Sequence, residues 1–525
     1  MTMYTKKYCL GLLAFILLNS LHFSCQDGGK SGEESASENA PPNIIFIMTD
    51  DHSYQTFSAY DDRYIKTPNL DRIAEEGALF TNSFVSNSIC APSRAVMLTG
   101  KHSHINGHLD NRMRFDSSQA TFPKHLQAAN YQTALVGKWH LKSQPTGFDH
   151  WEVLIGQGQY FNTDFVENGV KKQSEGYVTN VITDKSINWL NGRDKEKPFC
   201  LLVHHKATHR IWMPDTSLLN TLEGVEFEPP ANFFDDYEGR VAAQQQKMSI
   251  DKDMDLVWDN KLLDKEGEIK SGLRTAYERS QYGRMNEAQK AVWDAYYEPI
   301  IQDFKAAKLE GKELALWKYQ RYMQDYLKCV RSVDDNVGRI LDYLDENGLA
   351  ENTIVVYTSD QGFYMGEHGW FDKRFMYEQS LRTPLVMRYP NGLAANSTID
   401  ALVQNIDYAP TLLDLAGVEV PTEMQGKSMK PLLSDKAAEW REAIYYQYFE
   451  YPGAHSVKRH YGIRTDRYKL MHFYNDIDTW EFFDLQEDPE EMNNIYDDPA
   501  QADLIKELKA KLSDLQQEYA VEEMD

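Results

Sequence analysis

The sequence predicts an α/β fold, in which a doubly wound sheet carries helices on both faces and a small antiparallel subdomain follows at the C-terminus. Short apolar runs that end in polar or charged residues recur along the chain, a pattern typical of parallel strands that are buried on both faces. Stretches with a helical pattern lie between these runs, and this alternation indicates an α/β core. Beyond about residue 440, short strand candidates are followed by one amphipathic helix, which predicts the separate subdomain.

Four apolar runs are the clearest strand candidates, and each ends in residues that could carry chemistry. They lie at residues 42–51, 131–140, 198–205 and 353–361. A further strand candidate lies at 80–85, and helices are predicted at 67–78 and 327–347. Open α/β sheets bind ligands beyond the carboxyl ends of their strands, so we expect the functional residues at the ends of the four runs.

Composition and pattern divide the chain into four parts. We expect a signal or lipoprotein segment at 1–25, a flexible polar tether at 26–42, the α/β domain at 43–439 and a C-terminal α+β subdomain at 440–525. Residues 233–313 are charged and largely helical in pattern, which predicts an insertion that shapes the substrate cleft. Strands of the subdomain are predicted at 444–451, 461–463, 468–473 and 480–485, and its helix at 503–519.

The N-terminus has the pattern of an export signal. Lys6 and Lys7 precede an apolar run at 9–18, which has the length of a signal-peptide core and is short for a membrane span. A small residue before Cys25 resembles a bacterial lipobox, in which Cys25 is lipidated, although His22 departs from that pattern. We expect an exported protein, periplasmic or at the cell surface, held in the outer or inner membrane if Cys25 is lipidated. Simple cleavage and secretion is the alternative.

The acidity of the chain restricts its partners. The 525 residues carry a formal net charge of −25, which argues against nucleic acid, because a phosphate backbone requires a basic surface. Long-range steering of any anionic ligand would be repulsive, so any anion site must be a local cluster of Lys, Arg, His or a bound cation. Of five cysteines, only Cys200 and Cys329 lie outside the export segment and the motif described next, which does not indicate a disulfide framework.

The most specific motif begins at Cys90. Pro92, Ser93 and Arg94 follow it, and Thr99-Gly100 closes the run. The motif resembles the signature of the type I, formylglycine-dependent sulfatases. The resemblance implies an alkaline-phosphatase-like fold and oxidation of Cys90 to Cα-formylglycine by a sulfatase-maturing enzyme, because a plain Ser or Cys nucleophile would leave a stable sulfate ester. The alternative, a buried cysteine at a helix start, does not explain the other residues of the motif.

Two pairs of oxygen donors lie at predicted strand ends. Asp50 and Asp51 are adjacent, an arrangement that is costly unless a cation lies between the carboxylates, and Asp360-Gln361 offers a second pair. Four oxygen donors suit a hard ion, Ca²⁺ or Mg²⁺. The resemblance implies one Ca²⁺ held by these four residues, with the formylglycine from Cys90 and the substrate sulfate completing the shell. For Asp50-Asp51 alone, strand-end caps or turn acids would be the simpler interpretation.

The same resemblance assigns sulfate binding to a set of cationic residues. Arg94 would hold the formylglycine oxygen, and Lys138 and Lys373 would bind sulfate oxygens. Any one of these cations alone would be interpreted as a solvated surface residue. Several basic groups together with a metal ion can stabilise the charge on a transferring sulfuryl group, as an oxyanion hole does.

Two histidines complete the implied catalytic set. His140 belongs to the run Gly137-Lys138-Trp139-His140, which matches a family motif, and would be the base that collapses the sulfated intermediate. His209 aligns with the general acid that protonates the leaving alcohol. Thr208 replaces the proline that usually precedes this histidine, so His205 is the alternative.

Within the family, the run 360–378 is most similar to the N-acetylglucosamine-6-O-sulfatase branch of glycan-degrading bacteria. This resemblance implies that Asp372 and Arg374 bind the O3 and O4 hydroxyls of the sugar, since carboxylate and guanidinium suit vicinal hydroxyls. A surface ion pair is the alternative interpretation. His455 and His460 lie in a predicted loop at 452–460, from which they could contact neighbouring groups of the substrate.

We therefore expect a calcium-dependent sulfatase that removes 6-O-sulfate from glucosamine units of heparan sulfate, keratan sulfate or mucin. A sulfatase with another sugar or position specificity is one alternative, and a phosphonate or phosphodiester hydrolase of the same superfamily is another. A surface glycan-binding lipoprotein with an unmodified Cys90 is the non-enzymatic alternative. A binding protein has no need of a nucleophile precursor and a proton donor, which argues against this last reading.

Overall fold

The computed structural model describes residues 40–434 and 438–522. The described residues from 41 onwards belong to one compact unit, and the predicted boundary between the α/β domain and the C-terminal subdomain lies inside it. The predicted signal segment with Cys25, and the tether up to residue 39, lie outside the described residues. Among the described residues, no helix has both the length and the apolar character needed to cross a bilayer.

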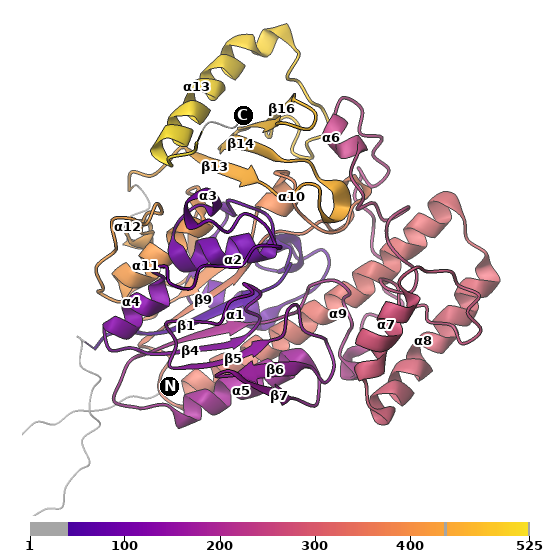
Figure 1. Cartoon of the computed structure of the whole chain (residues 1–525), viewed down its shortest axis with the longest axis horizontal. Coiled ribbons are helices and arrows are strands. Elements are labelled where there is room, and N and C mark those ends of the chain that lie inside the picture. The colour runs from indigo at the N-terminus through magenta and orange to yellow at the C-terminus, as the bar shows by residue number, and fades with distance from the viewer. Residues whose placement is uncertain (1–39, 435–437, 523–525) are drawn as a thin grey trace, which may run out of the picture. The chain divides into compact units, whose positions relative to one another are not determined.

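A mixed sheet of ten strands forms the centre of the unit, in the order β11-β2-β10-β9-β1-β8-β4-β5-β6-β7. Figure 1 labels β9, β1, β4, β5, β6 and β7 of this sheet. Its middle is parallel: β1 pairs with both β8 and β9, and β4 pairs with both β8 and β5. β10 runs antiparallel to β9 and β2, and β6 runs antiparallel to β5 and β7. The strands are β1 (Asn43–Thr49), β2 (Ala78–Phe80), β4 (Gln132–Gly137), β5 (His150–Leu154), β6 (Asp164–Glu167), β7 (Val170–Gln173), β8 (Phe199–His204), β9 (Thr353–Ser359), β10 (Leu385–Arg388) and β11 (Ser397–Ile399).

Helices cover both faces of this sheet, as predicted. Successive residues of β1 alternate between two hydrophobic clusters: Ile45 and Ile47 pack into one, and Phe46 and Met48 into the other. This alternation is the consequence of the two-residue period of a strand. The first cluster includes residues of α1 (Pro68–Glu75), α5 (Val178–Gly192) and α9 (Gly311–Glu346), and the second includes residues of α2 (Cys90–Thr99), α4 (Phe122–Ala128) and α11 (Tyr408–Leu415).

The region predicted as a helical insertion differs from that prediction in its first half. Between residues 233 and 273 the only described helix is the short α6 (Val241–Gln244), whereas α7 (Arg274–Ser280) and α8 (Glu287–Ala307) are helical as expected. Aspartates account for the difference, because their carboxylates accept backbone N–H bonds that a helix would otherwise use. Asp255, for example, accepts from the N–H groups of Val257 and Trp258 at 2.9 and 2.7 Å.

The C-terminal region forms the predicted antiparallel sheet with a helix against it. The strands β13 to β16 pair in sequence order, and α13 (Ala502–Glu518) packs on them (Figure 1). The strands are β13 (Ala443–Tyr448), β14 (His460–Thr465), β15 (Tyr468–Phe473) and β16 (Thr479–Asp484). The remaining short elements are β3 (Ser83–Phe84), β12 (Val403–Gln404), α3 (Ser103–Asn106), α10 (Glu378–Leu381) and α12 (Lys430–Ser434).

Candidate active site

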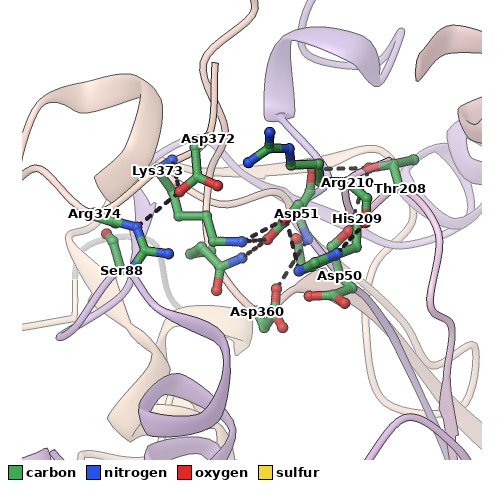
Figure 2. Close-up of polar contacts among 12 residues, drawn as sticks. Asp50, Asp51, Ser88, Thr208, His209, Arg210, Asp360, Asp372, Lys373 and Arg374 are labelled. Atoms are coloured by element: carbon green, nitrogen blue, oxygen red, sulfur yellow. Dashed lines mark hydrogen bonds and ion pairs between the residues drawn. The ribbon is translucent and has the colours of Figure 1, made fainter. Parts of the chain in front are cut away.

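The ends of neighbouring strands bring the predicted residues together. β1 and β9 are adjacent and parallel, so Asp50, after the end of β1, lies beside Asp360, after the end of β9. Side chains of consecutive strand residues point to opposite faces, but Asp51 has a left-handed φ of 66°. This turn breaks the alternation, and carboxylate oxygens of Asp50, Asp51 and Asp360 all lie within 4.8 Å of one another. The three carboxylates therefore meet as predicted (Figure 2).

These acids form a cradle that fits a hard cation. Asp50, Asp51, Asp360 and Gln361 are all fully buried. Asp50 Oδ1 and Gln361 Oε1 have no hydrogen-bond partner among the described residues, although buried polar atoms are normally paired. Burial raises the pKa of Asp51 to about 7 despite Lys373. Burial, followed by Asp50, raises the pKa of Asp360 to about 6. A bound cation would satisfy the two oxygens that have no hydrogen-bond partner in the described part of the chain, Asp50 Oδ1 and Gln361 Oε1.

Each of three predicted cations pairs with one of the three carboxylates. Lys138 forms a buried ion pair with Asp50, and Lys373 Nζ lies 2.6 Å from both carboxylate oxygens of Asp51. Arg94 donates from Nε to Asp360 Oδ2 at 2.9 Å. Burial alone would raise the pKa of Asp50, but Lys138 and the other neighbouring cations hold it well below its usual range.

Cys90 is the first residue of α2 and is only 1% exposed. Its Sγ lies in one cluster with a ligand atom of Asp50 and of His209, all within 4.8 Å. Burial raises the pKa of the Cys90 thiol well above its usual value, so the unmodified side chain stays protonated at neutral pH. The thiol itself is therefore a poor nucleophile at this position.

Other signature residues hold α2 in place rather than forming the site. The Ser93 hydroxyl donates to the backbone carbonyl of Asp360. Gly100 ends the helix in a left-handed conformation with φ of 63°, and its N–H donates to Val96 O at 2.8 Å. The Thr99 hydroxyl donates to Ala95 O at 2.7 Å. The signature is thus partly structural: it fixes where Cys90 begins its helix.

His209 and His140 both lie at the site with their rings largely buried. His209 Nδ1 lies 2.6 Å from Arg210 O, which assigns the proton to Nδ1 and leaves Nε2, 3.8 Å from Asp51 Oδ2, facing the carboxylates. Burial lowers the pKa of both histidines well below the usual value, and for His140 the Lys138 ammonium adds to the effect. Both rings are therefore neutral at pH 7 in the free protein.

Thr208 replaces the proline expected before His209, and its hydrogen bonds hold the turn at this position. Its N–H donates to Asp50 O at 2.8 Å, and its hydroxyl donates to Asp51 O at 2.9 Å. These bonds tie the turn before His209 directly to the end of β1. The structure brings His209 to the carboxylates and leaves His205 apart, fully buried, with neither ring nitrogen partnered among the described residues. Burial lowers the pKa of both histidines, so position separates them: His209 lies with Asp50, Asp51 and Cys90, which favours it over His205 as the acid.

With this geometry established, comparison with known proteins assigns the family. Residues 42–418 match the sulfatase family. The chain belongs to this family. Residues 366–518 also match the C-terminal region of N-sulphoglucosamine sulphohydrolase. The two matched ranges together span the α/β core and the C-terminal sheet. The protein is therefore a sulfatase, that is, a sulfuric ester hydrolase.

Individual relatives agree with this assignment. The sulfatase is 53% identical over 489 residues to an N-acetylglucosamine-6-O-sulfatase of Bacteroides thetaiotaomicron, a match covering 92% of this chain and 87% of the relative. It is 26% identical over 435 residues to a human N-acetylglucosamine-6-sulfatase, covering 78% of this chain and 67% of the human one.

Solved structures show the same fold. One, described as a complex with its substrate D-glucosamine-2-N,6-O-disulfate, gives a TM-score of 0.88 at 52% identity, covering 91% of this chain and 98% of that chain. A phosphonate monoester hydrolase from Silicibacter pomeroyi gives a TM-score of 0.66 at 18% identity, covering 91% and 95% of the two chains. This second likeness concerns the fold alone.

The predicted sugar-binding residues of the sulfatase, Asp372 and Arg374, lie on one loop, on either side of Lys373, which contacts Asp51 (Figure 2). Arg374 Nε donates to Asp372 Oδ1 at 3.0 Å, so the ion pair exists, but both residues are at most 5% exposed and do not form a surface pair. His455 Nε2 lies 3.3 Å from Asp372 Oδ2, and its Nδ1 lies 2.6 Å from Lys247 O. His455 therefore contacts Asp372 and joins it to the inserted region.

The prediction that His460 reaches over the cleft is not supported. His460 is the first residue of β14 and is fully buried, because the predicted loop at 452–460 ends one residue earlier than expected. Its Nε2 accepts from the Met376 N–H at 3.1 Å, and its Nδ1 lies 2.8 Å from Lys458 O. With both nitrogens occupied by backbone groups, His460 supports the chain beside Arg374 instead of contacting substrate.

Several residues that contact this site carry no sequence motif. Arg210 forms a bidentate ion pair with Asp259 at 2.6 and 2.7 Å, and this pair anchors the residue after His209 to the inserted region. Glu450 and Asn111 contact Arg374 and the start of α2 respectively. The sequence could have indicated Arg210, because this residue directly follows His209. Glu450 and Asn111 give no such indication, because both are distant in sequence from every motif.

Proposed function

We propose that this sulfatase removes 6-O-sulfate from N-acetylglucosamine or glucosamine units of glycans such as heparan sulfate, keratan sulfate or mucin. The observation that carries the proposal is the loop that places Asp372 and Arg374 immediately beside Lys373, which itself contacts Asp51. Sugar-binding groups and sulfate-binding groups are thus one residue apart. The names of the 53% identical relative and of the substrate in the similar complex support the same sugar and position.

The proposed metal is one Ca²⁺, held by Asp50, Asp51, Asp360 and Gln361. The donor set supports this choice, because carboxylate and amide oxygens without thiolate or imidazole suit a hard ion. The two unpaired oxygens, Asp50 Oδ1 and Gln361 Oε1, are the strongest support. When bound, the ion supplies positive charge that counters the charge on the sulfate oxygens.

The proposed nucleophile is formylglycine made from Cys90 by a maturing enzyme, and its hydrate supplies the oxygen that attacks sulfur. Arg94, Lys138 and Lys373 orient the hydrate and the sulfate, since all three already converge on the carboxylates around Cys90. Attack at sulfur breaks the S–O bond, so the configuration of the sugar carbon is retained.

Two histidines move protons in this proposal. An anionic sulfate next to His209 favours its imidazolium form, which then donates the Nε2 proton to the leaving sugar oxygen. His140 accepts the proton whose loss expels sulfate and restores the aldehyde. Its Nδ1 is buried and unpartnered among the described residues, which leaves it free for this role.

We also propose export and lipid attachment at Cys25, which the N-terminal sequence pattern supports. Cys25→Ala should move the protein from the membrane fraction to the soluble fraction. An unchanged distribution would show that Cys25 is not the anchor.

The function is tested by sulfate release from 6-O-sulfated N-acetylglucosamine, with protein co-expressed with a formylglycine-generating enzyme. We expect release by the wild type, and loss of release in Cys90→Ala and after chelation. If wild-type protein carrying a mass-confirmed aldehyde releases no sulfate from this sugar, the proposed substrate is wrong. Sulfated sugars with the ester at other positions then identify the substrate in the same assay.

A further inference from the structure

We propose that Glu450 is a positioning residue that fixes Arg374 relative to the nucleophile. This inference rests on the proposed role of Arg374 in binding sugar hydroxyls. Glu450 lies two residues beyond the end of β13, in the C-terminal sheet, and is 5% exposed. No motif or family match singles it out, yet it joins two segments of the active site that are distant in sequence.

Both carboxylate oxygens of Glu450 are occupied. Oε1 accepts from Arg374 Nη1 at 3.0 Å, and Oε2 accepts from the backbone N–H of Asn111 at 3.0 Å. A buried carboxylate with one oxygen on a guanidinium and the other on an amide has a fixed orientation, because moving either bond would leave a buried polar group unpaired.

The contact continues from Asn111 to the nucleophile. Asn111 Oδ1 accepts from the Ala91 N–H at 3.1 Å. Ala91 follows Cys90 in the first turn of α2, where backbone N–H groups have no partner within the helix. Asn111 satisfies one of them from outside the helix. The path from Arg374 to Cys90 therefore consists of Glu450, the backbone and side chain of Asn111, and one N–H of α2.

Arg374 needs such support because its backbone is strained. Its φ of 99° is a value that L-residues rarely adopt, and Asp372, two residues earlier, has φ of 82°. Strained backbone of this kind persists only where the surroundings hold it. Tyr446 donates its hydroxyl to Arg374 O at 2.6 Å, and the side chain of Arg374 contacts Asp372, Tyr448 and Glu450.

The lack of a side chain at Gly453 independently supports a fixed position for the Glu450 side chain. A Cβ at Gly453 would lie 2.7 Å from Glu450 Cγ and 3.0 Å from its Oε1, too close for undisturbed packing. The φ of Gly453 is −155°, which any residue can adopt. The glycine is therefore required by the close approach of Glu450 and not by backbone conformation.

The test is a double-mutant cycle on a 6-O-sulfated sugar with Glu450→Gln, Arg374→Ala and the double variant, each with its formylglycine content measured by mass. Glutamine keeps the shape but offers only one acceptor oxygen. We expect KM to rise about 10-fold in Glu450→Gln, the effect of one lost hydrogen bond to a charged group, with kcat within about twofold. The double variant should match Arg374→Ala, because Glu450 acts through Arg374.

Glu442→Gln is the matched control, since Glu442 is exposed and directly precedes β13; its kinetics should equal those of the wild type. Gly453→Ala displaces the Glu450 carboxylate without changing charge and should reproduce the rise in KM. Full additivity in the cycle, or a fall in kcat alone, would overturn the proposal. This result can be told apart from failure of the proposed function. In that case the wild type would act on another sulfated sugar, and the double-mutant cycle would be measured with that sugar.

Discussion

The proposed sulfate side and the proposed sugar side of this site are built in different ways. The sulfate side consists of Asp50, Asp51, Asp360 and the cations around them, and its carboxylates follow directly from the ends of two adjacent parallel strands. The sugar side consists of Asp372 and Arg374 on a strained loop, held by His455 and Glu450 from the C-terminal region. Chemistry is therefore fixed by the core of the sheet, whereas recognition depends on contacts between segments far apart in sequence.

The largest expected effect separates His209, which lies at the carboxylates, from His205, which lies apart from them. His209→Ala should lower kcat on the sugar sulfate by about 10²- to 10⁴-fold, because a general acid contributes in that range. His205→Ala should leave kcat within a few-fold and lower the melting temperature, since it removes a buried ring. Steady-state kinetics and thermal melts of both variants check this. Equal losses of kcat would mean that the acid has been assigned to the wrong residue.

Removing the metal should affect the sulfate side next. Chelation should abolish activity and lower the melting temperature, because a ligand that binds only the folded state stabilises it, by about 2.7 kcal/mol at 100 times its Kd. Adding back Ca²⁺ or Mg²⁺ separately, with calorimetric melts, identifies the ion. A melting temperature that changes neither with chelator nor with either ion would contradict the proposed cation site.

On the sugar side the expected effects fall on KM. Asp372→Asn should raise KM for 6-O-sulfated N-acetylglucosamine by about 10-fold through the loss of one charge-assisted hydrogen bond. The value of kcat should change less, because hydroxyl binding contributes similarly to substrate and transition state. Matched kinetics on an analogue that lacks the O4 hydroxyl provide the control. If Asp372→Asn has the same effect on that analogue, Asp372 does not bind O4.

The smallest expected effect concerns pH and the C-terminal sheet. Burial raises the pKa of Glu481 in β16 to about 7, partly offset by the Tyr377 hydroxyl that donates to Oε2 at 2.7 Å. A carboxyl with a raised pKa in the folded state favours folding at low pH, and this contribution is lost as pH rises from its ordinary value towards 7.

Glu481→Gln should therefore gain stability relative to wild type between about pH 4.5 and 7, the window from the ordinary Glu pKa to the raised one. Urea melts across this window measure the difference. A constant difference across the window would show that Glu481 does not titrate there. Activity should be unaffected apart from the change in stability.

Much of the sulfate side could be predicted from sequence because its residues belong to short motifs, several of them at strand ends. A buried apolar run fixes a strand, and the carboxyl ends of adjacent parallel strands lie together. Asp50, Lys138 and Asp360 were placed correctly on this reasoning. The four strands and the helix of the C-terminal region were also predicted to within a few residues, since alternation and amphipathicity are local signals.

The sugar side could be predicted only in part because its contacts are tertiary. No local pattern indicates that Glu450 contacts Arg374, or that His460 begins a strand and uses both ring nitrogens on backbone groups. The irregular chain at 233–273 was missed for a different reason: charged residues with helical spacing were read as a helix, while the aspartates bind nearby backbone N–H groups instead.

The burial of Cys90 determines whether its oxidation comes before or after folding. A side chain that is 1% exposed, with its backbone in the first turn of a packed helix, cannot enter the active site of another enzyme. Any enzyme that oxidises Cys90 must therefore meet the chain before α2 packs against the sheet. Under the proposed formylglycine mechanism, a molecule that folds with its thiol intact would remain inactive, so the fraction of active sulfatase would be fixed before folding is complete.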